Sequence, residues 1–146
     1  MADEERGLRG VLQKHAVALI SLCVALFSTS YNTWRNETTE AHRNVRQAAF
    51  SMLSTVGEFQ QTVDRRYWGG DRSDANRIRA WGAVSLLRDL GPLVSGDTRA
   101  RADALHARWS ADLDALDAGE RPAEERIAQA TAELRTQLIA DLVALQ

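Results

Sequence analysis

The chain is poor in residues that interrupt or cross-link a fold. Its 146 residues include one cysteine, two prolines and a single lysine, Lys14. Because Cys23 has no second cysteine to pair with, an intrachain disulfide is excluded and cysteine usage does not reveal the redox compartment. No proline or glycine occurs between residues 11 and 56, so no local signal stops one long helix from running through this region.

The chain also lacks a large excess of positive or negative charge. The sequence has 18 basic and 20 acidic residues, a formal net charge of −2. The two kinds are interspersed, whereas a nucleic-acid surface needs a basic stripe, so we expect no nucleic-acid partner. We interpret the preference for arginine over lysine, in an alanine-rich chain, as the composition of a GC-rich bacterial genome.

Residues 15–34 contain no Asp, Glu, Lys or Arg, although 26% of the chain is charged. As a helix, this run would be about 30 Å long, which matches the hydrocarbon layer of a bilayer. Lys14 and Arg35 bound the run, and Tyr31 and Trp34 lie where interfacial aromatic residues are expected. We therefore expect a transmembrane helix over 15–34, with these four residues at the membrane interface and lipid as a partner.

Two other interpretations of this run stay open. A cleaved signal peptide would be consistent with the small residues Ser28 and Ser30, and a buried core helix fits less well with the length of the run. Basic residues flank both ends, but Arg9 and Lys14 lie closest to the apolar core. We therefore expect a single-pass protein of a bacterial inner membrane with a periplasmic soluble domain, and the cytoplasmic side as the alternative.

The remainder of the chain has the 3–4 residue apolar spacing of amphipathic helices, and no segment has the alternation of a strand. We expect an all-α fold with a short tail over 1–14 and a soluble antiparallel bundle over 35–146. In this bundle the first, long helix continues from the membrane segment and packs with three shorter helices. The expected helices cover about 35–68, 74–90, 98–118 and 122–146.

Each expected helix has one apolar stripe that would face the core. In the first helix the stripe has the spacing of a coiled-coil seam, and it consists of Val45, Ala49, Met52, Val56, Phe59 and Val63. In the second it consists of Ile78, Trp81, Val84, Leu87 and Leu90, and in the third of Ala102, Leu105, Trp109, Leu113 and Leu116. In the fourth it consists of Ile127, Leu134, Leu138, Leu142 and Leu145.

Polar and breaker residues suggest where these helices end. Ser73 or Asp71 can cap the second helix and Asp97 the third, because a short polar side chain accepts from a free N–H of the first turn. Gly91-Pro92 should stop the second helix, and Pro122 suits the first turn of the fourth.

No catalytic or metal-binding pattern is present. His15, His42 and His106 lie on separate segments without a second ligand at a recognised spacing. The run of Asp112, Asp114 and Asp117 is typical of a solvated helix surface. We therefore expect no enzyme activity, no cofactor and no metal.

Some apolar residues are not needed for the expected core. Tyr67 and Trp68 end the long helix, where they either cap the bundle or form an exposed contact for a partner. Ile139 and Val143 widen the stripe of the last helix and could contact another subunit.

Three motifs carry a resemblance to known proteins: Ser30-Tyr-Asn-Thr-Trp-Arg-Asn-Glu37, Arg43-Asn-Val-Arg46 and Gly57-Glu-Phe-Gln60. Together they resemble a group of small, uncharacterised, membrane-anchored helical proteins of proteobacteria. This resemblance implies one transmembrane helix followed by a helical domain, and it implies no activity, substrate or catalytic residue.

We expect a non-enzymatic, membrane-anchored interaction protein, such as an accessory, assembly or scaffold subunit of an inner-membrane complex, or a homo-oligomer. The partners would be lipid and either another protein or a second copy. The alternative is a ligand-sensing bundle that holds a small molecule between helices near Trp81 or Trp109.

Overall fold

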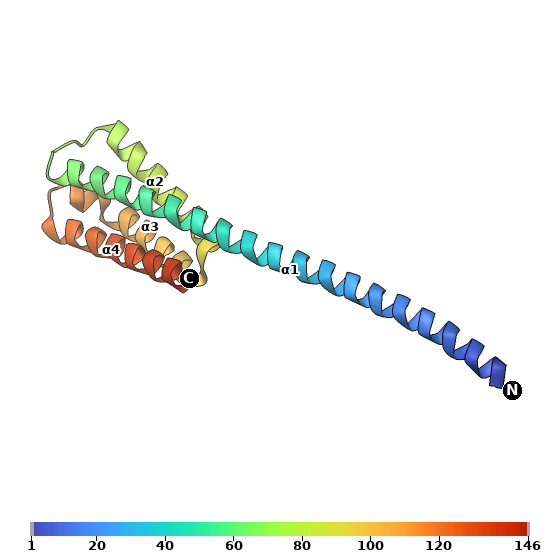
Figure 1. The fold of residues 1–146 in the computed structure, drawn as a ribbon. Helices are drawn as coiled ribbons and strands as arrows, with labels where there is room; N and C mark the ends of the chain where they lie inside the picture. Colours follow the sequence, from blue (N-terminus) through green and yellow to red (C-terminus); the bar gives the residue numbers. More distant parts are fainter. Residues whose placement is uncertain (1, 146) are drawn as a thin grey trace. The chain divides into compact units, whose positions relative to one another are not determined.

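A computed structural model describes the backbone of residues 2–145 and the side chains of this range except those of 2–14, 17, 19, 32–39 and 41. In the described residues the fold is all-α, as expected, and contains no strand (Figure 1). The chain divides into two units, residues 1–41 and 42–146, which are considered separately below. The helices are α1 (Ala2–Tyr67), α2 (Asp74–Val94), α3 (Gly96–Asp117) and α4 (Arg121–Ala144).

The first unit consists of the N-terminal part of α1. Its large apolar side chains that the structure describes are 55–80% exposed, and they include Ile20, Leu22, Val24, Leu26 and Phe27. Among the described residues, no helix combines the length and the apolar character that a bilayer crossing requires. The transmembrane helix expected over 15–34 is therefore not supported. The strongly apolar part, residues 16–27, would be about 18 Å long as a helix, less than the roughly 30 Å of a hydrocarbon core.

Most of the expected interface residues lie outside the described side chains. This applies to Lys14, Trp34 and Arg35. Tyr31 is described and is 58% exposed.

The second unit is the bundle, which residues 42–67 of α1 form together with α2, α3 and α4. Short connections join successive helices, so that neighbours in the chain run antiparallel (Figure 1). The expected stripes of α1 and α3 form much of the core. Only Val45 among them is half-buried, while residues such as Phe59 and Trp109 are fully buried. The rings of these two pack edge to face, with centroids 5.4 Å apart.

The helix ends follow the expected chemistry with two differences. Ser73 caps α2, where its hydroxyl accepts from the Asn76 N–H at 3.2 Å. Gly91-Pro92 does not stop α2, because a proline in the last turn removes one hydrogen bond without preventing a short continuation to Val94. Ser95, and not Asp97, caps α3.

Two aspartates of α3 are not part of a solvated surface. Asp117 pairs with Arg66, the last buried residue of α1, which is only 2% exposed. Asp112 is 6% exposed and accepts two hydrogen bonds from Arg126 of α4, at 2.7 and 3.0 Å. Asp114 alone fits the prediction, since its side chain is 96% exposed.

Candidate interaction surface

α2 is apolar on two opposite faces. Its inner face is buried against the bundle and consists of Asn76, Ala80, Val84, Leu87 and Gly91. At 100° per residue these positions fall within an arc of roughly 80°, which is the face expected of an amphipathic helix. The opposite side of α2 should then be polar.

The outer face of α2 is instead largely apolar or small. Ile78 is 70% exposed, Leu86 is 44% exposed and Leu93 is 60% exposed. Ala75 and Gly82 share the same side and are also exposed. The prediction that Ile78 belongs to the core is therefore wrong. The smaller Ala80 and Asn76 take the buried positions, because they allow α2 to pack closely on its neighbours.

Contacts at both ends hold α2 in this orientation. At its start, the Asn76 amide donates to the Thr62 carbonyl at 3.2 Å and accepts from Arg66 at 3.4 Å. At its end, a Cβ on Gly91 would lie 2.9 Å from the Cα of Arg99, so α2 and α3 approach there as closely as glycine allows. The outer face thus belongs to a helix that contacts its neighbours at both ends.

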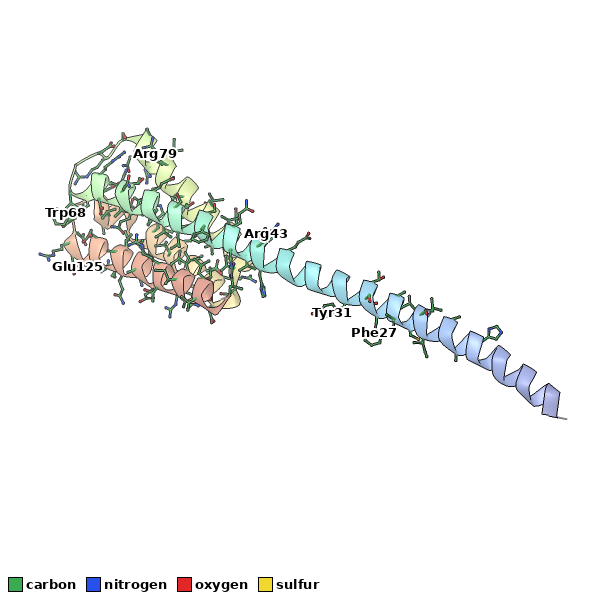
Figure 2. The ribbon with its side chains drawn as sticks, viewed as in Figure 1. Phe27, Tyr31, Arg43, Trp68, Arg79 and Glu125 are labelled. Carbon is green, nitrogen blue, oxygen red and sulfur yellow. The ribbon has the colours of Figure 1, made fainter. Side chains whose placement is uncertain are left out.

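Two opposite charges accompany the apolar residues of the outer face. Arg79 and Asp89 are both exposed, and Figure 2 shows Arg79 on the outside of α2. Ten residues of helix separate them by about 15 Å, too far for a direct pair. Neither forms an ion pair with any other residue in the part of the chain that the structure describes.

The connection after α2 is anchored by a carboxylate of α4. Asp141 accepts hydrogen bonds from the Ser95 and Thr98 hydroxyls, both at 2.6 Å, and from the Gln137 amide at 2.9 Å. Burial of Asp141 opposes its ionisation, but these three hydrogen bonds outweigh burial and lower its pKa. The ionised carboxylate therefore stabilises the junction between α2 and α3.

The residues predicted as partner contacts do not form one patch with α2. Trp68 is 71% exposed at the end of α1, and the half-buried Tyr67 packs edge to face on it with centroids 4.7 Å apart. Ile139 and Val143 are 50% and 61% exposed on α4. Trp68, Ile139 and Val143 are therefore exposed, whereas the outer face of α2 adds Ile78, which was predicted to lie in the core, and Leu86 and Leu93.

One hollow of the bundle could be considered as a ligand site. A shallow hollow of about 160 Å³ lies between α3 and α4, lined by Ala104, Arg108, Arg126, Gln129, Ala130 and Glu133. Trp81 and Trp109, near which the alternative hypothesis of a ligand-sensing bundle places a small molecule, do not line it. Within the described residues, no group of three or more histidine, cysteine or acidic side chains could hold a metal ion.

Comparisons of the chain with protein-family models, with curated proteins and with solved structures found no match.

Proposed function

We propose that this protein is a non-enzymatic, membrane-anchored interaction protein, an accessory or scaffold subunit of an inner-membrane assembly. The observation that carries this proposal is the outer face of α2, where Ile78, Leu86 and Leu93 are exposed to solvent. Exposed apolar side chains that gather on one face of a helix are typical of contact surfaces.

The membrane part of the proposal rests on the segment 15–34. Its described apolar side chains point in all directions around the helix, and a helix that is apolar all round requires either a protein or a lipid environment. The absence of charge over this whole run favours lipid. Such an anchor would confine the bundle and its partner to one surface.

Flotation of the full chain with lipid vesicles tests the anchor. We expect the unmodified protein to float with the vesicles and Leu22→Arg/Leu26→Arg to stay in the dense fraction. Each arginine costs about 2.5–3.5 kcal/mol near the centre of an apolar span. Gln47→Arg, at an exposed position of the bundle, is the matched control and should float. Equal flotation of all three proteins would remove the anchor from the proposal.

Extraction of native membranes in mild detergent tests the interaction. We expect the unmodified protein to migrate as an assembly larger than one chain, and Ile78→Ser/Leu86→Ser to release it as a monomer. Phe50→Ser, which also removes a largely exposed apolar side chain (62% exposed) but on α1, is the control and should leave the assembly intact. A strictly monomeric unmodified protein would contradict the proposed function.

A further inference from the structure

The outer face of α2 has a pattern that is complementary to itself. We propose that this face pairs with the same face of a second copy of the chain, with the two α2 helices antiparallel about a twofold axis that crosses the outer face at the level of Val84 along the helix. The proposal rests on the proposed role of this face as a docking surface, and it names the occupant. A twofold interface requires that each residue on one side of the axis meet a complementary residue from the other side.

The charges meet this requirement. Arg79 and Asp89 each lie five residues from Val84, on opposite sides. In the antiparallel pair, Arg79 of each copy therefore lies at the level of Asp89 of the other copy. Two symmetric ion pairs result, from two charges that have no ion-pair partner elsewhere in the described residues. Charge complementarity of this kind fixes the register of an interface.

The sizes of the apolar residues meet it as well. Gly82 and Leu86 each lie two residues from Val84, so that Leu86 of one copy faces Gly82 of the other. A Cβ on Gly82 would meet nothing within 4 Å in its own chain, so its missing side chain leaves room on the outer side. Ala75 and Leu93 lie nine residues from the axis and form a second small-to-large pair. Large side chains thus face small ones at these two levels of the helix pair.

The contact is modest in size. The 21 residues of α2 span about 30 Å, and a single pair of such helices buries less than the roughly 1,200 Å² of a standard interface. The dimer should therefore be weak when the chain is free in solution. Confinement of both copies to one membrane raises their effective concentration and would populate it.

Charge reversal tests the register directly. The test measures the dimerisation constant of the full chain in mild detergent by sedimentation equilibrium over a wide concentration range. We expect the unmodified protein to dimerise and Arg79→Glu and Asp89→Arg each to weaken dimerisation roughly tenfold or more, because each variant creates two like-charge contacts. An equimolar mixture of the two variants should form a heterodimer as strong as the unmodified dimer, since both of its charge pairs are then opposite in sign.

A steric variant and a control complete the test. Gly82→Leu should keep its helix content and lose dimerisation, because a Cβ at this exposed position meets nothing within 4 Å in its own chain, and the added side chain would fill the space for Leu86 of the other copy. Arg135→Glu, an exposed reversal on α4, should dimerise normally. If Arg79→Glu dimerises as the unmodified chain does, or if mixing restores nothing, the proposal is overturned.

The dimerisation and extraction experiments together distinguish a failure of the dimer proposal from a failure of the proposed function. If the purified chain is monomeric, but Ile78→Ser/Leu86→Ser still disrupts the assembly extracted from native membranes, then the outer face of α2 binds a different protein. The docking surface would then stand and the second copy would be wrong. Flotation of Arg79→Glu with vesicles, expected to be unchanged, shows independently that the anchor is intact.

Discussion

Arg66 Nη2 donates to Asp117 Oδ2 at 2.6 Å, and Arg66 Nε donates to the second carboxylate oxygen, so that the pair is bidentate. The Arg66 side chain is 2% exposed and that of Asp117 is 26% exposed. Asn76 accepts a further hydrogen bond from the guanidinium. These three residues join the last turn of α1, the last turn of α3 and the first turn of α2.

We predict that Asp117→Asn lowers the free energy of unfolding by about 3 kcal/mol, because it leaves the Arg66 charge buried without its counter-ion. Urea unfolding followed by circular dichroism measures this loss. Asp114→Asn is the control three residues earlier on α3. Its side chain is 96% exposed and lies 3.9 Å from Arg77, and a change there should cost less than about 0.5 kcal/mol. Similar losses in both variants would show that burial of the Arg66 pair does not matter.

The sequence was sufficient to predict four helices and much of their core. In α1 and α3 the apolar residues recur without ambiguity every three or four positions, and only one face of each helix can be buried. Phe59 and Trp109 therefore lie in the core as expected. A turn at Gly69-Gly70-Asp71 follows α1, and Gly70 there has a φ of 68°, a conformation that favours glycine.

The sequence was not sufficient to predict which face of a helix is buried where this depends on the neighbouring helices. α2 carries apolar residues on two faces, so periodicity alone could not decide whether Ile78 or Ala80 is buried. The close approach of α3 at Gly91 decides it in favour of the face with small residues. The burial of Arg66 and Asp112 was likewise hidden, because charged residues are predicted as exposed unless the partner that neutralises them is known.

The two faces of α2 should differ sharply in their contribution to stability. We predict that Leu87→Ala, on the buried face, costs about 2–5 kcal/mol through lost packing and a cavity. Ile78→Ala, at a position 70% exposed, should cost less than about 0.5 kcal/mol. Urea unfolding at low protein concentration, where self-association is negligible, measures both. A large loss for Ile78→Ala would place it in the core, as the sequence suggested.

Replacing either of two glycines of α2 with alanine should change the stability of the bundle, but in opposite directions. Gly82→Ala should stabilise the bundle by about 0.5–1 kcal/mol, because alanine favours a helix and its Cβ meets nothing within 4 Å. Gly91→Ala should destabilise it by about 1–3 kcal/mol, since the Cβ would lie 2.9 Å from the Arg99 Cα and push α3 away. Thermal unfolding gives the sign of each change. Stabilisation by Gly91→Ala would contradict the close approach.

The junction held by Asp141 should make stability depend on pH. Three hydrogen bonds outweigh the effect of burial and hold the pKa of Asp141 below its ordinary value of 3.8. A group whose pKa is lower in the folded state stabilises that state above its unfolded pKa and loses this contribution as pH falls through the folded pKa. We therefore predict that Asp141→Asn is less stable than the unmodified chain at pH 7, and that the difference shrinks between about pH 5 and 2. Urea unfolding across this range measures it, and a constant difference would show that the charge of Asp141 contributes nothing.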